Sequence, residues 1–206
     1  DEILEEASVI FVAMTRAQRS LQQLTSEGLY PLWPRQFGNG RRSRWHSRTN
    51  AWLNLEMGLC GDVDPRGFVD LRLHKTEASV AEVQELLSSQ PASLRGRKVL
   101  LRKAPYPPGS HKKFAYEIRL QEEQGGDERL LGVTTPQLTF DILKVMGKGY
   151  VLPSAIYNLR ITGVVTLGLR GDDAAGLAPD WAASGLWLGV NIYGTGDFKP
   201  RQWKGG

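Results

Sequence analysis

Apolar residues in the second half of the chain alternate with polar ones in short runs, and turn-forming residues separate these runs. A period of two is typical of half-buried β-strands. The sequence therefore predicts strands at residues 51–57, 68–73, 97–103, 114–121, 130–134, 156–169 and 186–193. The last two runs are rich in Val, Ile, Leu and Tyr and match the composition of strands best.

Two segments follow a helical period instead. In residues 79–88 the apolar positions fall three and four apart, which predicts a short helix. Residues 136–146 begin with Pro136 and are followed by Gly147, at the positions where helices favour these two residues. Because no helix separates most of the strands, a doubly wound parallel sheet is disfavoured. The pattern predicts an α+β fold, mainly β: a small curved sheet or barrel-like domain with two short helices.

Residues 25–50 differ from the rest in composition. They are rich in Gly, Pro and Arg, and Pro31 and Pro34 oppose helix. We expect a basic linker here, between residues 1–24 and a β-rich C-terminal accessory domain at residues 51–206. Within that domain, turn residues cluster at 62–67, 125–127 and 171–185.

The first residues of the chain predict a helix that is apolar nearly all round. One stripe has members at spacings of three and four: Ile3, Ala7, Ile10, Met14, Ala17 and Leu21. Such a helix belongs in the interior of a larger protein. Arg16 lies about 200° around the helix from Met14, so its guanidinium points away from the stripe and is placed to meet a phosphate. An ordinary amphipathic helix with a solvated Arg16 is the alternative.

This stretch resembles the sixth motif of UvrD/Rep-type superfamily-one DNA helicases. That motif runs through acidic residues, an aromatic residue, Val-Ala/Gly-x-Thr-Arg-Ala and then a basic or polar residue. The matching residues are Glu5, Glu6, Phe11, Val12, Ala13, Thr15, Arg16 and Ala17. The arginine pair that is usual before the aromatic residue is absent, and Gln18 stands where Lys or Met is commoner.

In that family the motif lies late in the polypeptide, in the second RecA-like domain. The resemblance implies that the chain is the C-terminal region of an ATP-dependent DNA helicase, with residues 1–24 as a helix split off from a RecA-like domain. It also implies that the parent protein uses ATP and Mg, with Thr15 and Arg16 at the ATP and Arg16 contacting the γ-phosphate, and that it binds single-stranded or forked DNA. A phosphate-cradling Gly-x4-Gly-Lys loop is absent, so we expect the fragment alone to hold no cofactor and to be inactive.

Basic residues are concentrated in the linker, although the net charge of the whole chain is only +4. No acidic residue occurs between Glu27 and Glu56. Guanidinium groups neutralise phosphates, and aromatic rings stack on unpaired bases. We expect six residues to contact nucleic acid: Arg35, Arg41, Arg42, Arg44, Trp45 and Arg48. The alternative is a basic connector whose aromatic residues, Trp52 among them, anchor it to the next domain.

Other chemistry-bearing residues form no recognisable site. Cys60 is the only cysteine, and the three histidines lack metal-ligand spacing, so we expect no disulfide and no metal. Asp62 and Asp64, like Asp172 and Asp173, stand where turns favour aspartate. There is neither an apolar run long enough to cross a membrane nor a secretory signal. We expect a cytoplasmic, nucleoid-associated protein without membrane contact.

A second function stays open on these residues: a stand-alone protein-interaction module with no nucleotide or DNA role. In both cases the β-rich domain has a repair or transcription protein as a candidate partner. The two functions differ measurably. DNA contact through arginines predicts a steep salt dependence, whereas protein docking predicts an apolar surface patch.

Overall fold

The computed structural model of the 206-residue chain describes residues 44, 46–48, 51–59, 61–121, 128–168 and 185–202. All of them belong to one compact unit, Arg44–Gly206. The predicted motif helix and residues 25–43 of the predicted linker lie outside the described residues. The folded unit begins inside the segment that the sequence assigns to the linker, because a first strand at His46–Arg48 pairs with the second.

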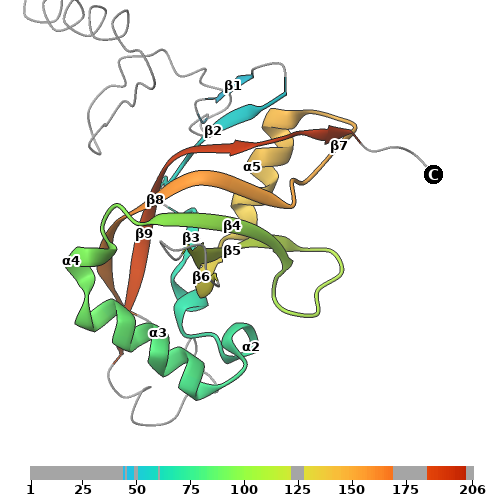
Figure 1. The fold of residues 1–206 in the computed structure, drawn as a ribbon. Coiled ribbons are helices and arrows are strands. Elements are labelled where there is room, and N and C mark those ends of the chain that lie inside the picture. Colours follow the sequence, from blue (N-terminus) through green and yellow to red (C-terminus); the bar gives the residue numbers. More distant parts are fainter. Residues whose placement is uncertain are drawn as a thin grey trace, which may run out of the picture. The chain divides into compact units, whose positions relative to one another are not determined.

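Within the described residues, ten strands form two antiparallel sheets (Figure 1). The strands are β1 His46–Arg48, β2 Leu53–Met57, β3 Val63–Asp64, β4 Lys98–Pro105, β5 Phe114–Leu120, β6 Arg129–Thr134, β7 Tyr150–Val151, β8 Ala155–Gly168, β9 Leu186–Phe198 and β10 Arg201–Gln202. Eight of them form the main sheet in the order β1-β2-β9-β8-β4-β5-β6-β3, and β7 pairs with β10. The predicted class, α+β and mainly β, is confirmed.

The helices of this region include the two that the sequence predicts. They are η1 Pro65–Phe68 (a 3-10 turn), α2 Leu71–His74, α3 Glu77–Ser89, α4 Pro91–Leu94 and α5 Pro136–Met146. The hydroxyl of Thr76 accepts a hydrogen bond from the backbone N–H of Ser79 at 3.1 Å and so caps the start of α3. Gly147 ends α5 with a φ of 87°, a left-handed conformation that glycine adopts without steric cost.

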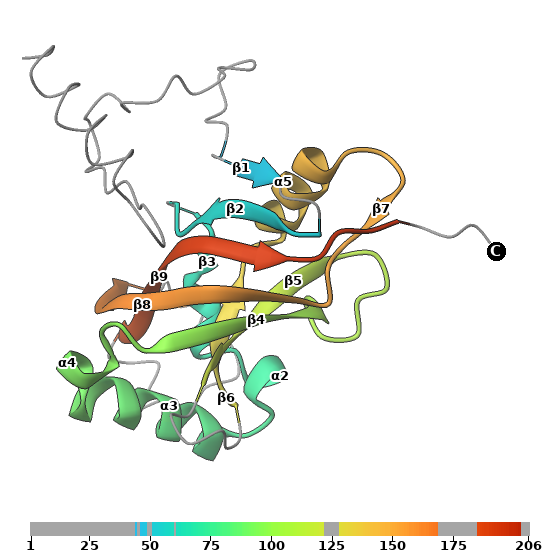
Figure 2. The ribbon, with the colours of Figure 1, turned by 45° about the horizontal axis from the view of Figure 1, so that its top comes forward.

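The main sheet curls around the buried ring of Phe68. A Cβ atom on Gly132 of β6 would lie 2.9 Å from Cε1 of this ring, and one on Gly189 of β9 would lie 2.9 Å from Cε2. Strands β8, β4 and β5 separate β6 from β9 in the sheet. One ring reaches both strands because the sheet is strongly curved (Figure 2), and the two glycines leave room for it.

The main hydrophobic core lies on the inner side of this curved sheet. Helix α5 contributes Leu138, Ile142 and Met146 to it, and α3 contributes Val83 and Leu87. Figure 1 shows the two helices near opposite ends of the sheet. Alternate strand residues complete the core, among them Leu53, Leu55, Val99, Leu101, Tyr116, Ile118, Leu120, Ile156, Leu159, Ile161 and Phe198. The other members of each alternation point outward and are mostly polar.

The predicted strand at residues 68–73 is wrong, because two aspartates cap helical turns there. The carboxylate of Asp64 accepts from the backbone N–H of Arg66 at 3.1 Å and starts η1. The carboxylate of Asp70 accepts from the backbone N–H of Arg72 at 2.9 Å and starts α2. The apolar alternation of this run is short, and local capping outweighs it.

The predicted strand at residues 186–193 ends too early, since β9 continues to Phe198. A Cβ atom on Gly196 would lie 2.7 Å from Cγ2 of Ile156, so this glycine serves close packing between strands rather than a turn. Apart from the far end of β9, the other predicted strands and both predicted helices are confirmed to within about two residues at each end, the usual uncertainty of such boundaries.

Candidate nucleic-acid interface

Arg44, which we expected to contact nucleic acid, is instead buried in the folded unit. Its guanidinium donates to both carboxylate oxygens of Asp62, with 2.6 Å between Nη1 and Oδ2. It also donates to Oδ2 of Asp141, from Nε at 2.9 Å and from Nη2 at 2.8 Å. The exposed side-chain fractions are 6% for Arg44 and 2% for Asp62. A phosphate does not reach a guanidinium enclosed in this way, so Arg44 is a structural residue.

This ion pair joins the two edges of the main sheet. Arg44 lies two residues before β1, Asp62 lies immediately before β3, and these strands end the sheet on opposite sides. Burial by itself lowers the pKa of Arg44, but the hydrogen bonds and charges of Asp62 and Asp141 outweigh it and raise that pKa. Asp62 also accepts from the backbone N–H groups of Gly58 and Leu59, each at 2.9 Å. Four donors thus converge on this carboxylate, three of them on Oδ2.

Asp62 and Asp64 are therefore occupied by structural hydrogen bonds rather than placed to hold a cation. Asp64 caps η1 and accepts from the side chain of Arg66. Among the described residues, no group of three or more His, Cys, Asp or Glu side chains is arranged to bind a metal ion. Asp172 and Asp173 lie outside the described residues.

Arg48, the other described arginine of the expected set, is exposed on β1. Its Cζ lies 5.2 Å from the centre of the Tyr150 ring, within the range of a cation–π contact. A hydrogen bond from Arg48 is the main cause that lowers the pKa of the Tyr150 hydroxyl, and a second one from Gln202 adds to it. Arg48 thus keeps its charge at the surface beside an aromatic ring.

A second pair of this kind lies nearby. Nζ of Lys199 is 5.0 Å from the centre of the Trp52 indole, and 38% of Trp52 is exposed. Trp52 directly precedes β2 and Lys199 directly follows β9, two strands that are neighbours in the sheet. The contact therefore places a cation above an exposed ring at the end of the β2–β9 pair.

The two pairs belong to one end of the sheet. Leu53 pairs with Arg48 on one side and with Phe198 on the other, and adjacent strands lie about 5 Å apart. The two-stranded sheet of β7 and β10 adds a third cation, Arg201, to this end. Gln202, the next residue after Arg201, pairs with Tyr150. We call this surface the end patch and define it by Arg48, Trp52, Tyr150, Lys199 and Arg201.

The end patch is basic and aromatic. Within the part of the chain that the structure describes, none of its three cations forms an ion pair with a carboxylate. Free cations of this type neutralise phosphates, and exposed rings stack on bases. The chemistry of the patch is thus that of a polyanion site with aromatic rings beside its cations.

The remaining expected site residues lie outside the described residues: Thr15, Arg16, Arg35, Arg41, Arg42 and Trp45. Of the two arginines that the structure places, it brings Arg48 to the end patch and keeps Arg44 in the interior. The sequence did not single out Tyr150, Lys199 or Arg201 for this surface. The basic composition of the C-terminal tail was the one available signal, and pairing across the sheet is invisible in it.

A separate group of buried polar side chains lies around α2. The hydroxyl of Tyr106 is 3.3 Å from Oδ2 of Asp64 and 3.5 Å from Oδ2 of Asp70. Nε2 of His74 lies 2.9 Å from the carbonyl oxygen of Gly67. Burial is the main cause that lowers the pKa of His74 and raises the pKa of Tyr106, so both side chains are neutral near pH 7. Each group has a structural partner, and we assign this cluster no chemistry.

No protein-family model, curated protein or solved structure matches this chain. None of the helices in the described ranges is long and apolar enough to span a membrane.

Proposed function

We propose that the chain is the C-terminal region of an ATP-dependent DNA helicase, and that its β-rich domain contacts DNA through the end patch. The resemblance of residues 5–18 to the sixth helicase motif supports the first part. One observation carries the second part: Arg48, the last arginine of the basic linker, lies on a folded surface with an aromatic partner. The fold adds Lys199 and Arg201 to the same surface from the other end of the chain.

The end patch would bind DNA by charge and by stacking. Arg48, Lys199 and Arg201 would neutralise phosphates, while Trp52 would stack on an unpaired base. Each phosphate contact with a single strand contributes about 0.7 to the slope of log affinity against log salt. Three contacts give a slope of about 2, to which Arg41 and Arg42 of the linker would add.

In the parent protein, bound Mg-ATP would supply the free energy for movement along DNA. Arg16 of this chain would contact the γ-phosphate beside Thr15, because an arginine there stabilises the charge on the transferring phosphoryl group. Without a phosphate-cradling loop the chain would hydrolyse nothing by itself. The parent would act in the cytoplasm at the nucleoid, with a repair or transcription protein as its second partner.

The test of the DNA contact is a salt titration of the full 206-residue chain with fluorescein-labelled oligothymidine, followed by anisotropy. The Arg48→Gln/Lys199→Gln variant is compared with Lys75→Gln, which removes an exposed cation next to α2. We expect the end-patch variant to lower the salt slope by about 1.4, since it removes two contacts, and the control to leave the slope unchanged.

A wild-type chain with no measurable affinity for the oligonucleotide at about 50 mM salt, the low end of the useful range, would overturn the proposed DNA contact. It would favour the alternative, a protein-interaction module with no nucleotide or DNA role. Equal slopes for the end-patch variant and the wild type would move the contact away from the end patch.

A further inference from the structure

The strand pairing of the main sheet is distorted around one point of β8. The β8–β9 register shifts between Tyr157 and Arg160, and the β4–β8 register shifts between Val99 and Leu101. Asn158, inside the first shift, has a φ of 68°, a left-handed conformation uncommon for residues other than glycine. Bulges of this type redirect side chains and occur often beside functional sites.

Amide–carboxylate hydrogen bonds from two strands hold this bulge in place. Nδ2 of Asn158 donates to Oδ2 of Asp197 at 3.1 Å, and Nδ2 of Asn54 donates to Oδ1 of the same carboxylate at 2.9 Å. Asp197 therefore ties β8 to β2 across β9. The distortion is a fixed feature of the fold, because side chains from three strands define it.

Two cations face each other beside the bulge. Lys98 on β4 is paired in register with Arg160 on β8, so both side chains point to the same face, and both are exposed. Like charges directly opposite each other destabilise a sheet. Arg160 donates from Nη1 to the carbonyl oxygen of Gly96 at 2.7 Å, and neither cation has a carboxylate partner within the described ranges. This arrangement costs stability, and an anion bound between the two side chains would offset their repulsion.

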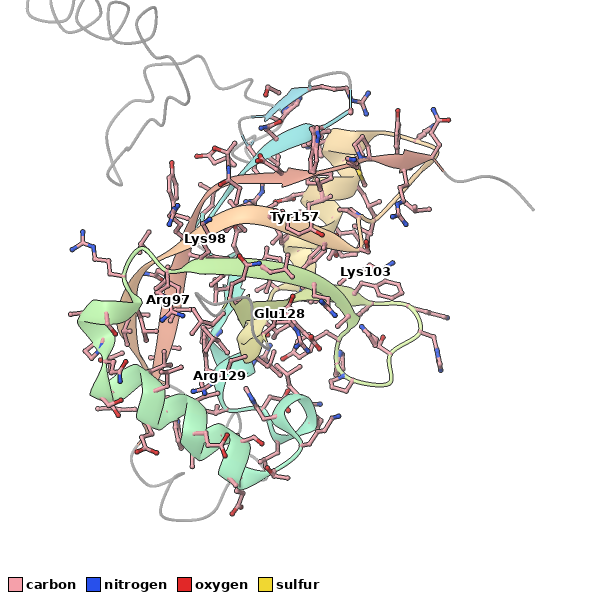
Figure 3. All side chains as sticks on the ribbon, viewed as in Figure 1. Arg97, Lys98, Lys103, Glu128, Arg129 and Tyr157 are labelled. Carbon is pink, nitrogen blue, oxygen red and sulfur yellow. The ribbon has the colours of Figure 1, made fainter. Side chains whose placement is uncertain are left out.

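An exposed ring completes the group. Tyr157 is 47% exposed and lies three residues from Arg160, at most about 10 Å along the strand. Its neighbours Ile156 and Leu159 belong to the inner core, so Tyr157 and Arg160 point outward. Figure 3 shows Tyr157 and Lys98 on the strands β8 and β4 that face the viewer.

We propose that Lys98, Tyr157 and Arg160, which we call the bulge site, bind an unpaired nucleic-acid strand. The two cations hold a phosphate, and the ring of Tyr157 stacks on the base of a neighbouring nucleotide. A duplex presents only base edges in its grooves, whereas an unpaired strand offers the base faces that a tyrosine ring needs. The bulge site shares no residue with the end patch. It rests on the proposed function in one respect, namely that its anion is a nucleic acid.

The experiment measures the affinity of the full chain for labelled oligothymidine and for a labelled duplex of equal length. Tyr157→Ala removes the ring, Tyr157→Phe keeps it, and Phe140→Ala removes an aromatic side chain that is 60% exposed on α5. We expect Tyr157→Ala to weaken single-strand binding roughly 5- to 100-fold and to leave duplex binding unchanged. Tyr157→Phe and Phe140→Ala should bind both ligands like the wild type.

The variant Lys98→Gln/Arg160→Gln is expected to weaken single-strand binding and to lower its salt slope by about 0.7 for the shared phosphate. Wild-type affinity in this variant and in Tyr157→Ala would overturn the bulge site, whatever the end-patch variant does. An equal loss of single-strand and duplex binding in Tyr157→Ala would also overturn it. If the bulge variants lose binding while Arg48→Gln/Lys199→Gln does not, the bulge site stands and the end patch fails. Circular dichroism confirms that each variant is folded.

Discussion

The buried guanidinium of Arg44 gives the sharpest prediction about stability. In Arg44→Gln the carboxylate of Asp62, 2% exposed, keeps only the two backbone N–H donors and loses its counter-ion. Removing one partner of a buried ion pair costs about 3–5 kcal/mol of unfolding free energy, because the other charge stays desolvated. That is a large part of the roughly 5–15 kcal/mol that a domain has in total.

The assay is urea unfolding followed by tryptophan fluorescence, with Arg48→Gln as the matched control. With an m value of about 2 kcal/mol/M, Arg44→Gln should lower the midpoint by about 2 M. Arg48 is exposed, so its substitution should change stability by no more than about 0.5 kcal/mol. The double variant Arg44→Gln/Asp62→Asn should recover part of the loss, since it leaves no unpaired buried charge.

Two results would refute this reasoning. One is equal stability of Arg44→Gln and Arg48→Gln, which would mean that Arg44 is not enclosed as described. The other is a double variant that is no more stable than Arg44→Gln, since the removal of both partners should leave less unpaired buried charge than the removal of Arg44 alone.

Three further predictions follow from single features of the fold. Burial lowers the pKa of His74, so the unfolded chain takes up a proton first as pH falls below about 6.5. The contribution of His74 to the unfolding free energy should be constant above that pH and should fall below it. Urea titrations should therefore show a less steep fall in His74→Gln than in the wild type. A Cβ atom on Gly132 would meet the buried ring of Phe68 at 2.9 Å, whereas one on Gly163 would meet nothing within 4 Å. In urea unfolding, Gly132→Ala should therefore lower the unfolding free energy by about 1–3 kcal/mol, and Gly163→Ala should leave it unchanged. Lys98→Gln relieves a like-charge pair and should raise the urea midpoint slightly; a lower midpoint would contradict the unfavourable pairing.

Local rules made much of this fold predictable. Helix α5 begins at Pro136 and ends before Gly147 as the sequence indicates, because both signals act within one turn of the helix. Strand β5 was predictable from its alternation. The failure at residues 68–73 has the same local origin, since Asp70 caps a helical turn in a run that also fits a strand.

The candidate site was predictable only in part, because its contacts join residues far apart in the sequence. Composition predicts nucleic-acid contact for both Arg44 and Arg48. In the fold, however, Arg44 binds Asp141 in the interior, whereas Arg48 contacts Tyr150 at the surface. Whether an arginine of a basic segment faces solvent depends on the carboxylates that the fold brings to it. The like-charge pairing of Lys98 was hidden for the same reason, since no hairpin turn joins β4 to β8 and fixes their register.

The size of the native polypeptide tests the helicase proposal most directly. An antibody raised against this chain, used on a lysate of the source cells, reports that size by immunoblot. We expect one band several times heavier than the 22.9 kDa of the chain, as the C-terminal region of a helicase requires. A single band near 22.9 kDa would contradict the proposal, because the match at residues 5–18 would then have no ATPase domain to complete.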